Sequence, residues 1–78
     1  MNTTEFALRG DHITLDALLK ATGLASSGGA AKVLIADGQV KVNAEAETRR
    51  GRKLRAGDTV SLGEVAVQVC AAAPSPAG

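Results

Sequence analysis

Most of the basic side chains of this 78-residue chain fall in one short window, residues 41–55. The chain as a whole has a net charge of only +1, and only Glu45 and Glu47 oppose the basic residues inside the window. Like charges crowded in this way repel one another. A solvated surface loop and a phosphate-binding patch both explain such a window, because arginine pairs bidentately with phosphate oxygens and lysine acts as a point charge. The basic residues in the window are Lys41, Arg49, Arg50, Arg52, Lys53 and Arg55.

Residue types that perform catalysis are present without the neighbours that catalysis needs. His12 follows Asp11 and serines stand at 26–27, but no Gly-x-Ser-x-Gly turn or second base accompanies them. The pair Gly28-Gly29 lacks the Lys-Ser/Thr that completes a P-loop. The single Cys70 excludes an internal disulfide and a multi-cysteine zinc site, and we expect it to be a buried small hydrophobe. The sequence therefore predicts no catalytic residues, no cofactor and no metal site.

Length and composition predict one small folded domain with a thin core. Apolar residues make up 45% of the chain and the mean hydropathy is +0.07, which is typical of a folded protein. The one aromatic residue, Phe6, is expected in the core, so bases have no exposed ring on which to stack. Without a cysteine pair or an apolar run of about 20 residues, we expect a cytoplasmic monomer. The domain is predicted at residues 1–70, followed by a flexible tail at 71–78.

The N-terminal third of the chain predicts a strand and then a helix. Residues 3–8 favour a short strand with Phe6 and Leu8 on one face. Thr14 is expected to cap the helix with its side chain, and Gly23 to end it at a positive φ. Apolar residues recur with helical spacing at Leu15, Leu18 and Leu19.

A second helix is predicted between a serine cap at position 26 or 27 and the stop signal Asp37-Gly38. Its first turn contains Gly28 and Gly29, each of which costs up to about 1 kcal/mol relative to alanine. The two glycines indicate either close packing between helices or bare N–H groups offered to a phosphate. The apolar side of this helix is expected to consist of Ala30, Ala31, Val33, Leu34 and Ile35.

After Gly38 the apolar residues alternate, which predicts short strands. In the first of these strands Lys41 faces outward between inward valines, and Asn43-Ala44 is a plausible turn. Leu54 is expected to anchor the loop around Gly51. Because the helices come early and the strands mostly later, the chain predicts an α+β domain with both helices on one face of a small antiparallel sheet. The strands are expected at residues 39–43, 45–48, 59–62 and 65–70.

Several short motifs follow one another in order along the chain. They are Thr14-Leu15-Asp16, Gly23-Leu24, Ser27-Gly28-Gly29-Ala30-Ala31-Lys32 with Leu34-Ile35, Gly38-x-Val40-x-Val42-Asn43, and Gly57-Asp58-x-Val60. Over about residues 13 to 62, this ordered set resembles the S4 RNA-binding domain, and most of all the small stand-alone bacterial S4 proteins. Larger relatives join the module to enzymes, and we expect none of that chemistry because the chain has no room for a second domain.

The resemblance implies an S4-like fold with an αL motif, in which two helices pack on a small, bent, mostly antiparallel sheet. It also implies one RNA-facing surface that includes the arginine-rich segment at residues 49–55, hereafter the basic loop. Three positions depart from the family pattern: Gly28 replaces an arginine, Thr14 a frequent base, and Ala44 a glycine. The first two changes remove phosphate contacts of the family, so we expect RNA binding that is either weaker or shifted toward the basic loop. The implied RNA-binding residues are Ser27, Lys32, Lys41, Asn43, Arg49, Arg50, Arg52, Lys53 and Arg55.

We therefore expect a non-catalytic RNA-binding module that recognises structured RNA, ribosomal or transfer RNA, by its phosphate backbone, with the ribosome as a candidate partner. The alternative is an adaptor that docks its basic loop on an acidic partner in a ribosomal or RNA-processing complex. The RNA interpretation requires the cations of the second helix, the next strand and the basic loop to share one exposed ridge. It fails if those cations are dispersed over opposite sides or neutralised by Glu45, Glu47 and Asp58.

Overall fold

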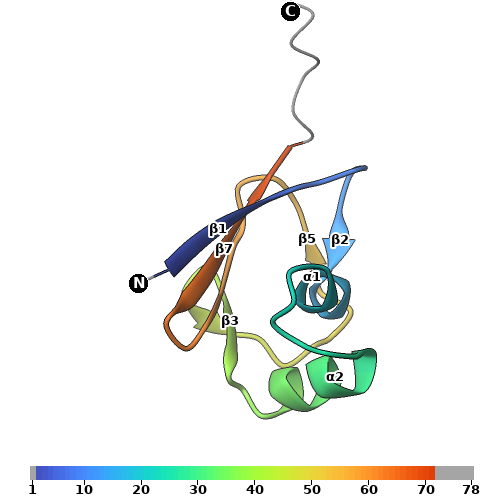
Figure 1. Cartoon of the computed structure of the whole chain (residues 1–78), viewed down its shortest axis with the longest axis vertical. Coiled ribbons are helices and arrows are strands. Elements are labelled where there is room, and N and C mark those ends of the chain that lie inside the picture. The colour runs from blue at the N-terminus through green and yellow to red at the C-terminus, as the bar shows by residue number, and fades with distance from the viewer. Residues whose placement is uncertain (1, 72–78) are drawn as a thin grey trace, which may run out of the picture.

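Two helices cover one face of a five-stranded sheet in the computed structural model, which describes residues 2–71 (Figure 1). The helices are α1 (Leu15–Ala21) and α2 (Gly28–Ala36). The strands are β1 (Asn2–Ala7), β2 (Ile13–Thr14), β3 (Val40–Val42), β4 (Glu45–Ala46), β5 (Lys53–Leu54), β6 (Thr59–Leu62) and β7 (Val65–Cys70). The α+β class predicted from the sequence is confirmed. The tail predicted at 71–78 lies outside the described residues apart from Ala71.

The larger sheet has the strand order β1-β7-β6-β3-β4, and only the pair β1–β7 is parallel. The expected antiparallel strands are therefore present, although β4 ends at Ala46 rather than at residue 48, and one parallel edge strand joins them. A second, two-stranded sheet pairs β2 with β5, with Ile13 opposite Leu54 and Thr14 opposite Lys53. This small sheet was not expected, because two residues are too few to show an alternating pattern. It ties the basic loop to the segment that leads into α1.

Helix α1 begins without the side-chain cap expected at Thr14. The N–H of Leu15 donates to the carbonyl oxygen of Arg52 at 2.9 Å, and the N–H of Asp16 donates to that of Arg50 at 3.2 Å. These two donors of the first turn are therefore already satisfied by the main chain of the basic loop, which replaces a side-chain cap. The same two hydrogen bonds fasten the basic loop to the start of α1.

Helix α2 begins at a side-chain cap, since Ser27 Oγ accepts a hydrogen bond from the N–H of Ala30 at 3.1 Å. The two glycines that follow are exposed, and a Cβ atom at either would make only an ordinary van der Waals contact with a side chain. A Cβ atom at Gly28 would lie 4.0 Å from Lys20 Cδ, and one at Gly29 would come no closer than 3.8 Å to another residue. The packing interpretation of this glycine pair is therefore wrong.

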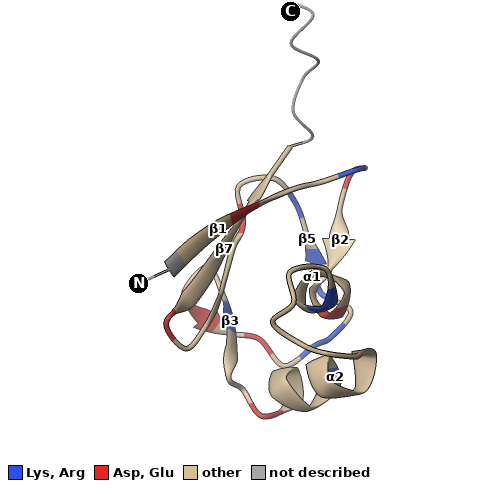
Figure 2. Ribbon diagram, in the orientation of Figure 1, with Lys and Arg blue, Asp and Glu red and all other residues tan. Residues whose placement is uncertain are grey.

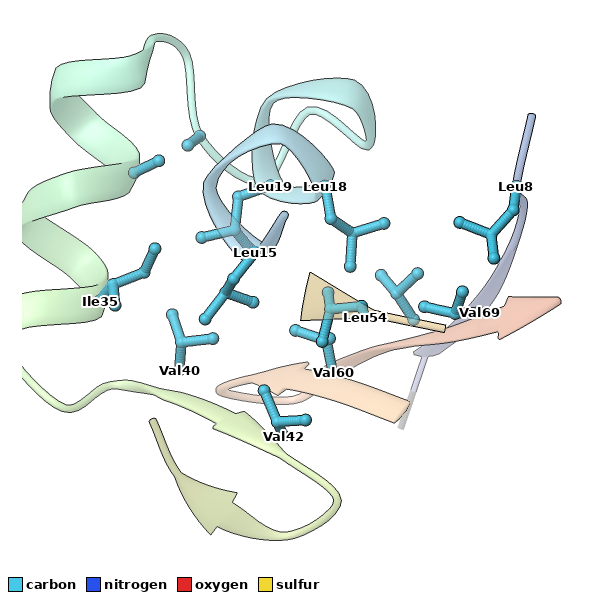
Figure 3. Packing of buried hydrophobic residues seen from close by; sticks show 13 residues of the cluster. Leu8, Leu15, Leu18, Leu19, Ile35, Val40, Val42, Leu54, Val60 and Val69 are labelled. Carbon is cyan, nitrogen blue, oxygen red and sulfur yellow. The ribbon is translucent and has the colours of Figure 1, made fainter. Parts of the chain in front are cut away.

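The hydrophobic core lies between the helix pair and the sheet (Figure 3). Leu54 is fully buried there, which confirms its predicted role as an anchor. Val33 was expected on the apolar side of α2 but is 63% exposed. The buried side of this nine-residue helix consists of Ala31 and Ile35, one turn apart, and a residue two positions beyond Ala31 faces the other way. The fully buried large side chains are Leu15, Leu18, Leu19, Ile35, Val40, Leu54, Val60, Val67 and Val69.

The backbone is left-handed at Gly23, where the sequence predicted a positive φ, and also in the turn predicted at Asn43-Ala44. Gly23 has a φ of +80° just after α1. The turn between β3 and β4 places Asn43 at φ +53° and Ala44 at φ +71°. Positive φ at both central residues is the geometry of a two-residue hairpin turn, and Asn-Gly is the pair that adopts it most easily. Ala44 therefore holds this turn with a side chain that disfavours it. Neither helix of residues 2–71 is long and apolar enough to serve as a membrane span.

Candidate nucleic-acid interface

The basic loop connects β4 to β6 and contains β5, and Figure 2 shows lysine and arginine gathered along it. Arg52 is half-buried, whereas the other four cations of the loop are exposed. The main chain of the loop is held by the β2–β5 pair, by the hydrogen bonds to the start of α1, and by the burial of Leu54. A fixed backbone of this kind presents its side chains from defined positions. The cations of the loop are Arg49, Arg50, Arg52, Lys53 and Arg55.

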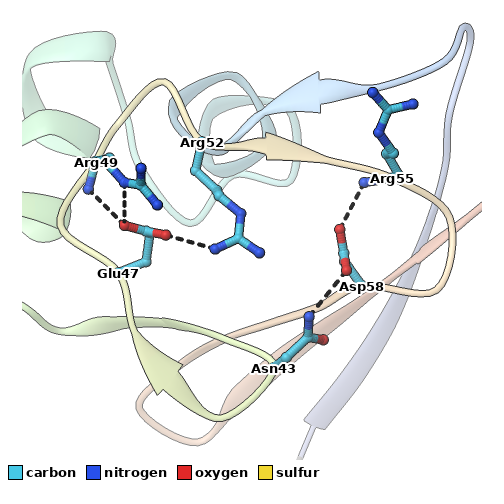
Figure 4. A network of polar contacts seen from close by, with 6 residues as sticks. All are labelled: Asn43, Glu47, Arg49, Arg52, Arg55 and Asp58. Carbon is cyan, nitrogen blue, oxygen red and sulfur yellow. Dashed lines mark hydrogen bonds and ion pairs between the residues drawn. The ribbon is translucent and has the colours of Figure 1, made fainter.

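Glu47 stands against two of these cations and is only 8% exposed (Figure 4). Its Oε1 accepts a hydrogen bond from Arg52 Nη1 at 2.7 Å. Its Oε2 accepts from Arg49 Nε at 3.2 Å and from the Arg49 main-chain N–H at 3.2 Å. The hydrogen bond from Arg52, followed by those from Arg49, lowers the pKa of Glu47 from 4.5 to about 2. Glu47 is therefore ionised near neutral pH.

Asn43 and Asp58 join the β3–β4 turn to the end of the basic loop (Figure 4). Asn43 Nδ2 donates to Asp58 Oδ1 at 3.0 Å, and Asn43 Oδ1 accepts from the N–H of Thr59 at 3.0 Å. Asp58 Oδ2 accepts from the N–H of Arg55 at 2.8 Å. That main-chain hydrogen bond, more than the one from Asn43, lowers the pKa of Asp58. Both polar atoms of the Asn43 amide thus bond within the chain, so the structure gives Asn43 a bracing role, and its contact with RNA stays a prediction.

Two further predicted residues belong to α2. Ser27 Oγ is occupied as the helix cap, and Lys32 is exposed in the middle of the helix. Lys20, near the end of α1, comes within 4.0 Å of the Cβ position at Gly28. Lys20 was not predicted from the sequence as a site residue. The short connection after Gly23 was the available signal, because it returns the chain so that α2 begins beside the end of α1.

Lys41 is separated from these groups by the sheet. Its neighbours Val40 and Val42 are buried in the core under the helices, so alternation places Lys41 on the outer face. There it lies in register with Ser61 of β6 and Ala46 of β4. The structure therefore does not bring Lys41 together with the basic loop, and the single ridge expected from the sequence lacks this member.

The three acids that could neutralise the basic loop behave differently. Glu47 pairs with two arginines, whereas Asp58 bonds to the main chain of Arg55 and to Asn43. Glu45 is exposed and makes no ion pair within residues 2–71. The loop thus keeps most of its positive charge, and the two paired arginines keep other N–H donors.

The surface around Arg49 and Arg52 is hollowed on two sides. One hollow of about 360 Å³ adjoins Glu47 and the β3–β4 hairpin, and a shallower one of about 450 Å³ extends over Gly51 and Lys53. No aromatic ring lines either hollow, and Phe6 packs against the core. Guanidinium groups here can donate several hydrogen bonds to an anionic oxygen, which is the chemistry of phosphate binding.

Comparisons with known protein sequences show which proteins this chain is similar to. A model of the S4 domain family matches residues 6–70. The chain is 50% identical to YbcJ of Escherichia coli (strain K12) over 60 residues, which are 77% of this chain and 86% of YbcJ. The name of YbcJ provisionally describes an RNA-binding protein. The chain is also 46% identical over 50 residues, 64% of this chain and 70% of the other, to RlbA of Bacillus subtilis (strain 168). The name of RlbA provisionally describes a ribosome maturation protein.

The fold is also similar to an experimental one. The solution structure of YbcJ from E. coli superposes with a TM-score of 0.68 at 45% sequence identity, covering 90% of each chain. That structure is described as revealing an αL motif involved in RNA binding. The likeness therefore extends over nearly all of both chains.

Proposed function

Because this chain belongs to the S4 domain family, we propose that it binds structured RNA through phosphate contacts made by the basic loop. The S4-like fold with its αL motif, expected from the sequence, is confirmed. On this proposal residues 1–70 act as one non-catalytic RNA-binding domain that works as a monomer in the cytoplasm. Ser27, the cap residue of α2, and Lys32, in the middle of that helix, also contribute on this proposal.

The observation that carries the proposal is the fastening of a strongly basic loop to the start of α1 through the main chain. Leu15 and Asp16 donate to the carbonyl oxygens of Arg52 and Arg50, so holding the loop in place requires neither guanidinium group. Binding a polyanion does not then require the loop to be ordered at the same time, which lowers the entropic cost of association.

Structured RNA is favoured as the ligand for two reasons. The chain has a single Phe, Tyr or Trp residue, Phe6, which packs against the core, so splayed bases find no such ring on which to stack. This favours recognition of the RNA backbone and its shape. Ribosomal RNA is the first candidate because of the name carried by the relative RlbA, and ribosome association is part of the proposal.

A matched pair of charge reversals tests the proposal. Arg50 is exposed and its side chain has no hydrogen bond or ion pair among residues 2–71, so Arg50→Glu breaks neither and loses only the longer-range attraction to Asp16. Arg9, exposed between β1 and β2 and outside the basic loop, supplies the control Arg9→Glu. Loss of a charge-assisted contact predicts at least about tenfold weaker binding to a ribosomal RNA hairpin for Arg50→Glu. The control should bind like the wild type.

Two outcomes would contradict the proposal. If the Arg50→Glu and Arg9→Glu variants bind RNA equally well, the basic loop is not part of the RNA-binding interface. If, in addition, Arg50→Glu abolished retention of an acidic protein partner, the adaptor function would replace RNA binding.

A further inference from the structure

An ionised acid in the middle of a surface that binds a polyanion is unfavourable on charge alone. Glu47 is the one buried charged residue within residues 2–71, and both of its carboxylate oxygens bond to the basic loop. If its charge acted only by repelling phosphate, Glu47 would weaken RNA binding. Its geometry indicates the opposite effect.

We propose that Glu47 is a positioning residue that holds the guanidinium groups of Arg49 and Arg52 as a two-armed clamp for RNA phosphate. This inference rests on the proposed RNA-binding function. Glu47, Arg49 and Arg52 are called the arginine clamp below. Glu47 itself does not touch the RNA in this arrangement, because its two oxygens face the arginines.

The contacts of the arginine clamp leave its outer donors available. Arg49 bonds to Glu47 through Nε, so both of its terminal nitrogens have no partner within residues 2–71, and its side chain is 77% exposed. Arg52 bonds through Nη1 alone, and its side chain is 35% exposed. Because a guanidinium group is planar and rigid, fixing one nitrogen restricts the direction of the others. RNA then meets two arginines that have already lost part of their rotamer freedom.

Neighbouring Glu45 makes it possible to distinguish the positioning effect of Glu47 from the effect of its negative charge. Glu45 lies two residues before Glu47, is exposed, and makes no ion pair within residues 2–71. The substitutions Glu45→Gln and Glu47→Gln remove the same charge from nearly the same place. Charge alone predicts that both variants bind RNA at least as tightly as the wild type. Positioning predicts that only Glu47→Gln weakens binding.

The experiment compares dissociation constants for one fluorescently labelled ribosomal RNA hairpin at fixed salt. Releasing two arginine side chains predicts binding about fivefold to tenfold weaker for Glu47→Gln. Glu45→Gln is expected to bind equally or more tightly. In an Arg49→Gln/Arg52→Gln background, measured at low salt, adding Glu47→Gln should cause no further loss. A purely structural role for Glu47 would keep the loss in that background.

The remaining outcomes would overturn either the positioning role of Glu47 or the proposed RNA binding. If Glu47→Gln binds as tightly as Glu45→Gln, or if its loss persists without the arginines, the positioning role is overturned. If the wild type binds no RNA, the proposed function fails and the positioning role fails with it. Should circular dichroism show that Glu47→Gln is unfolded, Glu47→Asp takes its place, because it keeps the charge and shortens the side chain by one methylene. Weaker binding by that variant supports positioning, and binding equal to the wild type overturns it.

Discussion

Raising the salt concentration should weaken RNA binding steeply if the basic loop meets the phosphate backbone. Each phosphate that a cation neutralises releases counterions, and log K falls by about 0.7–0.9 per contact for each unit of log salt. The basic loop carries Arg49, Arg50, Arg52, Lys53 and Arg55. With all five on phosphates the slope is about −3.5 to −4.5, so a fourfold rise in salt weakens binding roughly a hundredfold or more.

The structure indicates which side chains should contribute to the salt dependence of RNA binding. Arg50 and Lys53 are exposed and have no ion pair within residues 2–71, so Arg50→Gln or Lys53→Gln should each make the slope shallower by about 0.7–0.9. Lys41 is equally exposed but projects from the other face of the sheet. Lys41→Gln is therefore the matched control, and its slope should equal that of the wild type.

Fluorescence anisotropy with a labelled ribosomal RNA hairpin, repeated at several salt concentrations, measures these slopes directly. A wild-type slope shallower than about −1 would mean that hardly any phosphate is neutralised. The basic loop would then not bind the phosphate backbone through its five cations. A slope for Lys41→Gln that is as shallow as that of Arg50→Gln would refute the assignment of the interface to the helix side of the sheet.

Three further predictions concern stability. Ala44→Gly should raise the free energy of unfolding by about 1 kcal/mol, because Ala44 lies at φ +71° where a side chain is disfavoured, and an unchanged thermal midpoint would contradict this. Leu54→Ala should lower the free energy of unfolding by about 2–5 kcal/mol, because Leu54 is fully buried, and urea unfolding showing a loss under about 1 kcal/mol would contradict its anchoring role. The pKa of Glu47 is about 2 when folded, against an ordinary 4.5, so its stabilising effect is complete above pH 4.5 and is lost as the pH falls toward 2. The difference in thermal midpoint between wild type and Glu47→Gln should therefore shrink over that range, and a constant difference would argue against the ion pairs.

The helices and strands whose apolar residues recur at a regular spacing could be predicted from the sequence. Leucines at helical spacing and a glycine at a positive φ defined α1, and alternating valines defined β3 and β7. These signals are local, since burial of one face imposes a period on neighbouring residues. The inward orientation of Val40 and Val42 and the outward one of Lys41 followed from the same rule.

The contacts that hold the basic loop depend on residues far apart in the chain. Strands β2 and β5 have two residues each and pair across roughly forty positions, so no local pattern indicates them. The cap expected at Thr14 failed for the same reason, because main-chain carbonyl groups from Arg50 and Arg52 took its place. Propensity describes a residue in its own segment and carries no information about a distant carbonyl group that arrives on folding.

The sequence predicted which cations form the candidate site. It did not predict the contacts among the side chains of the site. The basic loop was identified by charge, but Glu47 was counted only as an acid that could neutralise it. Its burial and its bonds to Arg49 and Arg52 arise from the position of the β3–β4 hairpin beside the loop. Lys41 was grouped with the loop by nearness in sequence, although the sheet separates them.

RNA is expected to dock on the basic loop, on the start of α1 that is fastened to it, and on the exposed start of α2. Amide chemical-shift mapping of the ¹⁵N-labelled protein, titrated with a ribosomal RNA hairpin, locates the bound surface residue by residue. The largest shifts are expected at residues 49–53, at Leu15 and Asp16, whose N–H groups bond to the loop, and at the start of α2. Shifts confined to the outer face of the sheet around Lys41 and Ser61 would contradict this expectation.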